Sequence, residues 1–177
     1  QGFFLNNTSN DVSVMRTFLK GEKIYRNSFF CNWGTESLTD DFEVLHEILN
    51  ANGSVRCSYV ESETSTYNPN RGYIRENKEW SEGLGSLPAG SYTYRYTIDC
   101  ENVIPESNES NNVFEYPFTI EAEFLTISKN SVSTDASELR GSITVTANYA
   151  WTVSKNVSWI SVSPTSGSGN GTISYTI

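Results

Sequence analysis

The residues best suited to chemistry gather in one run, Asp99 to Asn112, which reads DCENVIPESNESNN. Carboxylate and amide oxygens are the hard ligands that Ca²⁺ selects, so a calcium site built on Asp99, Glu106 and Glu109 is one interpretation. The EF-hand spacing D-x-[DN]-x-[DN]-G is missing from the run. The favoured alternative is a turn-rich connection, because Asn, Asp and Ser side chains bond to nearby backbone amides.

Aromatic side chains form a second group of candidates, because exposed rings can stack on sugars. The candidates for carbohydrate contact are Tyr67, Tyr73 and Trp80 in one polar stretch, and Trp151 and Trp159 nearer the C-terminus. Tyr and Trp also bury their rings readily while a polar tip stays wet. Core packing is therefore the favoured interpretation of these residues, and glycan contact is the alternative.

Groups for catalysis are sparse. The chain has one histidine, His46, and neither a G-x-S-x-G nor an HExxH motif. A lone histidine among strand residues is more often structural than catalytic. Carboxylate pairs that meet only in space stay open as an alternative. We expect no enzyme activity, and no cofactor other than the calcium considered above.

Strands must position all of these residues. Alternating polar and apolar residues predict strands at Asp11–Leu19, Lys23–Trp33, Asp41–Leu49, Ser54–Val60, Ser91–Ile98 and Val113–Ile120. The Asn-Ala-Asn-Gly turn after Leu49 predicts a hairpin rather than a helix. The stretch from Glu61 to Lys78 is the least regular part of the chain. Short strand-like runs also fill the part after Glu123, so the sequence predicts an all-β fold.

The first part resembles the CARDB family, the cell adhesion related domain found in bacteria. The likeness rests on Gly21-Glu22, on Asn32-x-Gly34 at the end of the second strand, and on the acidic run. The matching residues of that run are Asp99, Asn102, Glu106, Asn108, Glu109, Asn111 and Asn112. The resemblance covers residues 9–120 and implies an Ig-like β-sandwich that the run closes. Residues 1–8 are expected to be a tail or the end of an upstream domain.

The three cysteines are Cys31, Cys57 and Cys100. In such a sandwich the second and sixth strands run in the same direction, so their C-terminal ends lie at the same end of the sandwich. Cys31 and Cys100 are at these two strand ends. They are the preferred disulfide pair. Three free thiols are the equally weighted alternative.

Residues 121–123 read as a short acidic linker, and residues 124–177 resemble the BACON family, described as Bacteroidetes-associated and carbohydrate-binding. The resemblance rests on Trp151 and on Trp159 in the string SWISVSPTSGSGNGTISYTI. It implies a second Ig-like sandwich whose pattern continues beyond Ile177. We therefore expect two tandem Ig-like β-sandwiches, the second incomplete, in a chain that carries further domains.

A formal net charge of −9 argues against nucleic acid or an anionic membrane as partner, since both repel an acidic surface. No apolar run is long enough to span a membrane. These features and the two resemblances imply a non-catalytic adhesion or spacer module, exported to the surface of a bacterium. A glycan or a cell-surface protein is the expected partner. The alternatives are a carbohydrate- or mucin-binding accessory module, and the C-terminal part of a secreted peptidase or glycosidase.

Overall fold

The computed structural model describes residues 2–6, 15–79, 87–133 and 139–177. The fold is all-β, as the sequence predicts, and the chain divides into two compact units, Gln1–Glu121 and Ala122–Ile177. Among the described residues, none forms a helix long and apolar enough to cross a membrane. The two units are described separately below.

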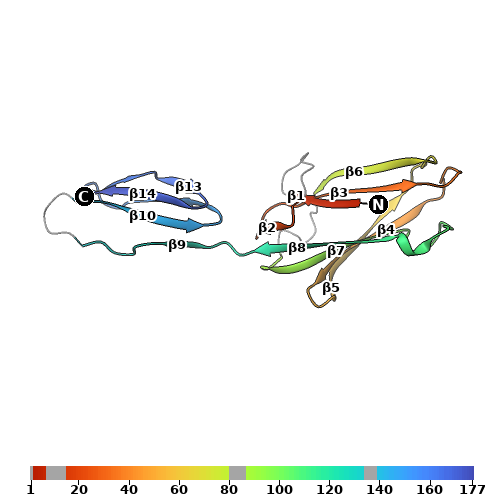
Figure 1. Ribbon diagram of the computed structural model, residues 1–177, viewed down its shortest axis with the longest axis horizontal. Helices are drawn as coiled ribbons and strands as arrows, with labels where there is room; N and C mark the ends of the chain where they lie inside the picture. Colours follow the sequence, from red (N-terminus) through yellow and green to blue (C-terminus); the bar gives the residue numbers. More distant parts are fainter. Residues whose placement is uncertain (1, 7–14, 80–86, 134–138) are drawn as a thin grey trace. The chain divides into compact units, whose positions relative to one another are not determined.

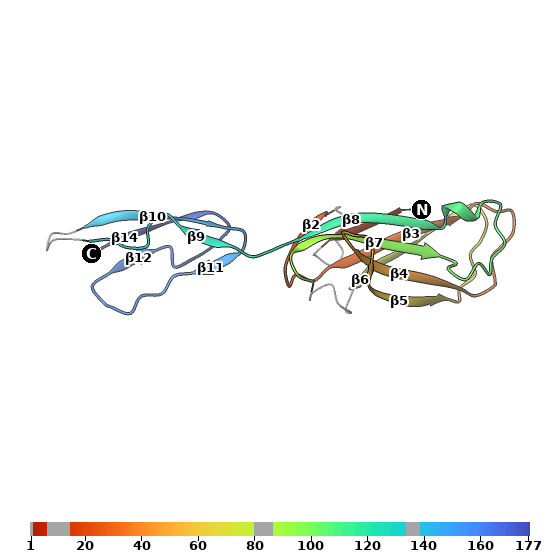
Figure 2. The ribbon, with the colours of Figure 1, turned by 90° about the horizontal axis from the view of Figure 1, so that it is seen from below.

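The first unit is a sandwich of two sheets (Figure 1). One sheet has the strand order β1-β3-β6 and the other has the order β2-β8-β7-β4-β5. Figure 2 shows β8, β7, β4 and β5 in succession across the larger sheet. The strands are β1 (Gly2–Asn6), β2 (Thr17–Leu19), β3 (Tyr25–Asn32), β4 (Phe42–Asn50), β5 (Val55–Glu63), β6 (Arg71–Glu79), β7 (Gly90–Ile98) and β8 (Val113–Glu121).

This order is that of an immunoglobulin-like sandwich. In the usual nomenclature β3 and β6 are strands B and E, and β4, β7 and β8 are strands C, F and G. The first strand is split between the sheets: β1 pairs antiparallel with β3, and β2 pairs parallel with β8. The predicted hairpin is confirmed, because β4 and β5 pair antiparallel around a turn in which Gly53 has φ of +81°.

Strand β7 shows how alternation in the sequence builds the core. Tyr92, Tyr94, Tyr96 and Ile98 are buried, and the residues between them are less buried. The Tyr92 hydroxyl donates to the Pro88 carbonyl oxygen at 3.0 Å, just before the strand. This is a tyrosine corner, which holds the turn that leads into strand F of such sandwiches.

The unit contains two strands that the sequence does not predict. Residues 2–6, expected as a tail or the end of an upstream domain, form the edge strand β1 and pair with Tyr25–Phe29 of β3. The irregular stretch also contains a strand, since Arg71–Glu79 pairs along β3. Both strands are polar or short, and only their pairing with β3 defines them. The predicted residues Asp11–Val14 lie outside the described residues.

The second unit contains a four-stranded sheet of order β12-β14-β10-β9 and a two-stranded sheet of β11 and β13. The strands are β9 (Leu125–Ile127), β10 (Arg140–Ala147), β11 (Ala150–Thr152), β12 (Ser161–Ser163), β13 (Ser166–Ser168) and β14 (Gly171–Thr176). Its core consists of Val145, Ala147, Trp151 and Ile173. On β9, Leu125 and Ile127 pair with the core residues Ala147 and Val145 but are themselves exposed.

Glycines make room for Trp151. Its indole Nε1 donates to the Gly169 carbonyl oxygen at 2.8 Å. A Cβ placed on Gly167 would lie 2.4 Å from the indole, and one on Gly171 would lie 2.7 Å from it. The Ser- and Gly-rich hairpin therefore has its composition because backbone must approach the ring closely.

We expect Gly167→Ala to lower the free energy of unfolding of the second unit by about 1–3 kcal/mol, because overpacking forces the indole or the backbone to move. Chemical denaturation of the full chain, followed by tryptophan fluorescence, measures the change. Ser168→Ala, at the exposed neighbouring position, is the matched control and should change stability little. Equal stability of both variants would contradict the packing described here.

Candidate functional site

One end of the first sandwich carries a cavity of about 420 Å³, here called the pole cavity. It lies between the segment that follows β3 and the connection between β7 and β8, which Figure 1 shows at the same end of the unit. One wall is formed by residues 31–36 and 38, and the other by residues 104–108 and 111. A smaller pocket beneath it is lined by residues of both strand ends, including Cys31, Ile98 and Asp99.

Asn32 fixes the first wall. Its Nδ2 donates to the carbonyl oxygens of Glu36, at 3.0 Å, and of Tyr67, at 2.9 Å. Its Oδ1 accepts the Gly34 amide at 2.9 Å. A Cβ on Gly34 would lie 3.0 Å from that oxygen, so the position favours glycine. The Asn-x-Gly motif therefore encodes a self-bonded turn.

Asp99 fixes the second wall. It is buried, its φ is +47°, and its two carboxylate oxygens accept the amides of Val103 at 2.8 Å and Ile104 at 2.7 Å. Asn102 also has a positive φ, +56°, and its amide donates to the Asp99 carbonyl. Asp and Asn tolerate this backbone conformation better than most residues. The run is thus the turn-rich connection that the sequence favours.

The same connection continues through a short 3₁₀ turn, η2 (Glu109–Asn111). Asn108 Oδ1 accepts the Ser110 amide at 3.1 Å, and Glu109 Oε1 accepts the Glu106 amide at 2.7 Å. Partial burial raises the pKa of the Glu106 carboxyl, and the nearby carboxylates of Glu109 and Asp99 raise it further. Three carboxylate oxygens of this loop, both of Asp99 and Oε1 of Glu109, therefore accept backbone amides of the same loop.

The proposed calcium ligands do not form a cage. Asp99 points to backbone amides, and Glu109 bonds the Glu106 amide. Within the parts of the chain that the structure describes, no group of three or more His, Cys, Asp or Glu side chains is placed to share a metal ion. Calcium binding by Asp99, Glu106 and Glu109 remains a hypothesis.

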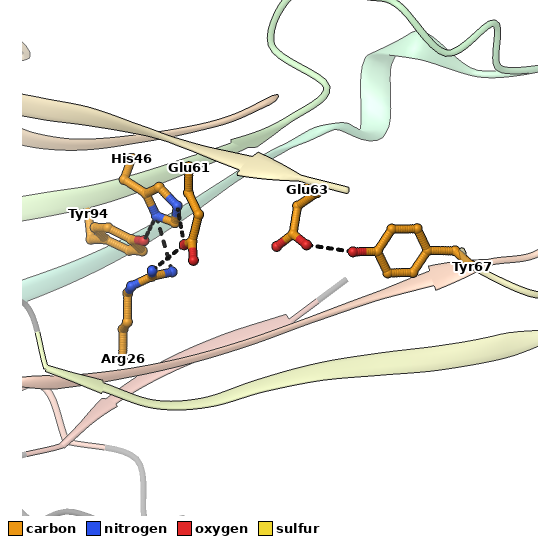
Figure 3. Close-up of polar contacts among 6 residues, drawn as sticks. All are labelled: Arg26, His46, Glu61, Glu63, Tyr67 and Tyr94. Atoms are coloured by element: carbon orange, nitrogen blue, oxygen red, sulfur yellow. Dashed lines mark hydrogen bonds and ion pairs between the residues drawn. The ribbon is translucent and has the colours of Figure 1, made fainter. Parts of the chain in front are cut away.

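A second polar group lies inside the sandwich and consists of Arg26, His46, Glu61 and Tyr94 (Figure 3). We call it the interior polar cluster. Arg26 comes from β3 in the smaller sheet, and the other three residues come from β4, β5 and β7 in the larger one. Arg26 forms an ion pair with Glu61, and its Nη1 lies 3.4 Å from His46 Nδ1. His46 has 0% of its surface exposed.

The neighbours of His46 determine its tautomer. Arginine can only donate hydrogen bonds, and Arg26 Nη1 and the Tyr94 hydroxyl both face His46 Nδ1. Nδ1 therefore accepts, and the proton is on Nε2, which lies 3.4 Å from Glu61 Oε2. The His46 ring also stacks on Tyr59, with ring centroids 4.4 Å apart.

Burial lowers the pKa of His46, and the Arg26 charge lowers it further despite the opposing effect of Glu61. Hydrogen bonding by His46 and by Arg26 lowers the pKa of Glu61 well below its ordinary value. Burial raises the pKa of Tyr94, which keeps the hydroxyl as a donor. The cluster at neutral pH thus contains one cation, one anion and a neutral imidazole.

The sequence predicted His46 as structural, and its position supports that interpretation. It did not single out Arg26, Glu61 or Tyr94. One signal was available: Arg26, Asn27 and Ser28 are buried in succession beside a register shift in β3, where the polar run breaks the alternation. That signal indicates an irregular strand, but it does not show which distant residues contact Arg26.

The predicted sugar-contact residues have different fates. Tyr67 is buried and its hydroxyl donates to Glu63, while Tyr73 packs on Tyr67 and on Phe30. Trp151 is 6% exposed and belongs to the core of the second unit. Trp159 is 63% exposed. Trp80 lies outside the described residues.

Cys31, Cys57 and Cys100 are all free thiols in the structure, so the preferred Cys31–Cys100 bond is not formed in it. The expectation that both strand ends reach one pole holds, because Cys31 and Asp99 line a common pocket. Sequence reasoning missed Trp33, which lines the pole cavity and is 74% exposed. Trp33 is the last residue of the predicted strand Lys23–Trp33, a position that does not indicate an exposed ring.

Comparisons with known proteins give two similarities. Residues 117–177 match the family model described as the viral BACON domain. The matched stretch begins within β8 and includes the whole second unit. Among solved structures, the chain is similar to a CARDB domain from Pyrococcus furiosus in complex with di-metal ions. The two share 18% identity with a TM-score of 0.46, over 68% of this chain and 88% of that chain. A search of curated proteins finds no match.

We expect the melting temperature of the full chain to be the same in millimolar CaCl₂ and in EDTA. The reason is that Asp99 and Glu109 already accept backbone amides. Differential scanning calorimetry measures it, with MgCl₂ as the ionic-strength control. A melting temperature that rises with calcium concentration would revive the calcium site, because a ligand bound by the native state stabilises it.

We expect the free energy of unfolding to fall as the pH drops below about 6.5, with a slope of at most about 1.4 kcal/mol per pH unit from this one proton. His46 is the only histidine, and its folded pKa is lowered, so the unfolded chain takes up a proton that the folded chain does not. Below about pH 4.5 Glu61 adds to the loss in the same direction, since its folded pKa is also lowered.

Urea denaturation between pH 5 and 7.5 measures this slope. The His46→Gln variant should lack the contribution of His46 to the slope, even if its free energy of unfolding at pH 7 differs from that of the wild type. Glu106 acts in the opposite direction because its pKa is raised, but it is present in both proteins and cancels in the comparison. The His46 ring signals in NMR should titrate at a lower pH in the folded chain than in the unfolded chain. A wild-type slope retained by the variant would contradict the assignment.

Proposed function

We propose that this chain is a non-catalytic adhesion module of an exported surface protein. Its sandwiches attach to a glycan or surface protein and hold other domains at a distance. Such a module needs rigid scaffolds with recognition groups at the ends, because loops carried by a packed sandwich present side chains in fixed positions. The first unit has this organisation, with its interior occupied by packed aromatics and its cavity at one pole.

One observation carries the proposal most directly. The one histidine of the chain, His46, contacts Arg26 and Glu61 between the sheets, and these two residues form an ion pair. His46 has no exposed surface on which a substrate could meet it. A general acid or base must come within hydrogen-bond reach of its substrate, so this placement supports a structural role for the cluster.

The net charge and the family match support the proposed location and partners of the module. The net charge of −9 disfavours nucleic acid and anionic lipid as partners. The match of residues 117–177 to a viral BACON domain supports a place outside the cell, on a particle or a cell surface. The exposed Leu125 and Ile127 on the core face of β9 support a role in which this piece works attached to further domains.

A second candidate is carbohydrate binding by the second unit itself. Trp159 favours it, because an indole exposed by 63% in a unit that matches a BACON domain offers a surface for a sugar ring. Trp151, the other candidate in this unit, is unsuited because its ring packs against glycines in the core.

Adhesion is tested with the full chain applied to immobilised mucin, to a panel of plant and microbial polysaccharides, and to intact bacterial cells. We expect retention on at least one surface, and no new reducing ends or free amines after long incubation, because a binding module leaves its ligand unchanged. Turnover abolished by a point variant of this chain would refute the non-catalytic assignment. Absence of retention on every surface would refute adhesion.

The Trp159→Ala variant separates the second candidate from the first. If the second unit is the sugar-binding part, retention on glycan surfaces should fall at least about tenfold, the scale expected for loss of an aromatic anchor. Unchanged retention would remove Trp159 from the site. Because Trp159 is exposed, its loss should leave the melting temperature nearly unchanged, which the same preparation can verify.

A further inference from the structure

The pole cavity has the dimensions and composition of a small-ligand site. Its volume of about 420 Å³ falls within the range of roughly 300–1,000 Å³ common for such sites. Leu38, Ile104 and Pro105 give it apolar surface, and Thr35, Glu106 and Asn111 give it polar groups. Ligand sites combine these two components, the apolar part for affinity and a few polar groups for orientation.

The turn that carries Trp33 is held by hydrogen bonds, and the Trp33 ring is exposed. It lies between Asn32, whose side chain bonds three backbone groups, and Gly34, whose amide is one of those three. The indole is 74% exposed and makes no hydrogen bond to another described residue. Because the backbone of this turn is already ordered, a ligand that covers the ring has only the side chain to order, which favours use of Trp33 as a binding platform.

The opposite wall is equally fixed and offers groups that bond sugar hydroxyls. The loop is anchored by Asp99 and by the turn at Asn108, so the side chains beyond them have defined positions. The Asn111 amide, exposed, has no hydrogen-bond partner among the described residues and can donate and accept. The Glu106 carboxylate can accept, and the Thr35 hydroxyl can do both.

The charge of the cavity narrows the ligand class. Its described lining includes the carboxylates of Glu36 and Glu106 and no lysine or arginine. Glu109 and Asp99 lie close enough to Glu106 to act on it electrostatically. An anionic ligand would therefore be repelled. A neutral molecule with hydroxyl groups on its edge and an apolar ring face fits this lining. Its hydroxyl groups match the Glu106 carboxylate and the Asn111 side-chain amide, and its apolar face matches the Trp33 indole.

We propose that the pole cavity binds a neutral pyranose unit of an oligosaccharide. Trp33 stacks on the apolar face of the ring, and Asn111 and Glu106 bond its hydroxyl groups. The site belongs to the first unit and is separate from the aromatic residues of the second. It names the ligand of the proposed adhesion module and so rests on that function, but it can fail independently of it.

The test uses the full chain on a glycan array that contains neutral, sialylated and sulfated glycans, followed by calorimetry with the neutral glycans retained. We expect binding to neutral glycans. Trp33→Ala should weaken it at least about tenfold and Asn111→Ala about fivefold, in line with the loss of an anchor and of one hydrogen-bonding group. Val55→Ala, at an exposed position outside the cavity lining, is the control and should leave the affinity unchanged.

Several outcomes would overturn the inference. Loss of binding in Trp159→Ala but not in Trp33→Ala would place the sugar site in the second unit. Retention of sialylated or sulfated glycans alone, or of polyamines and basic peptides in a parallel assay, would contradict the neutral class. Binding to cells or mucin protein without any glycan would overturn this site yet leave the adhesion function standing.

Cys31 provides a readout that does not depend on affinity variants. Cys31 is among the residues that line the pole cavity, whereas Cys57 and Cys100 are not. A saturating neutral glycan should slow alkylation of Cys31 by N-ethylmaleimide severalfold and leave the other two thiols unaffected, as followed by mass spectrometry of peptides. Equal rates at Cys31 with and without the glycan would show that the ligand binds elsewhere.

Discussion

The ion pair between Arg26 and Glu61 joins the two sheets of the first unit. Moving charges out of water costs several kcal/mol for each ion unless they are paired and hydrogen-bonded. Glu61 supplies the opposite charge, and His46 and Tyr94 occupy the remaining polar positions around the guanidinium. Because arginine keeps its charge at all ordinary pH values, the sheets cannot separate or slide without leaving that charge unpaired.

Antibody domains join their two sheets by covalent chemistry. There a disulfide links strands B and F across the sandwich. In this chain Arg26 on β3 and Tyr94 on β7 occupy the corresponding strands, and both contact His46 on β4. The cysteines of the unit are free and lie at strand ends or on β5. Hydrogen bonds and an ion pair thus connect the two sheets of this unit.

The same strand connects the interior to the pole. Strand β3 begins next to the interior polar cluster at Arg26 and ends at Asn32, whose side chain holds the turn that carries Trp33. The titratable side chains of the interior polar cluster stabilise the sandwich, and the exposed Trp33 ring lies on the turn at its end. In the second unit close approach of backbone to Trp151, permitted by glycine, fixes the core by shape instead of charge.

Local sequence determined much of this fold. Alternation in residues 91–98 gave the buried tyrosine face, the Asn-Gly turn gave the β4–β5 hairpin, and the Asp and Asn residues of the 99–112 run gave a self-bonded connection. All three depend on side chains and amides within a few residues of one another. A single sequence therefore contains the information needed to predict them.

Tertiary structure decided the rest, because burial depends on what lies across the sheet. Arg26 and Glu61 are 35 residues apart, and nothing in either segment shows that they meet. Trp33, at the end of a predicted strand, is 74% exposed, although the ring of Tyr67 in the irregular stretch is buried. Residue type and period describe which faces a strand has. Only the packing of distant strands determines which face is covered, and so which side chains stabilise the fold and which can meet a ligand.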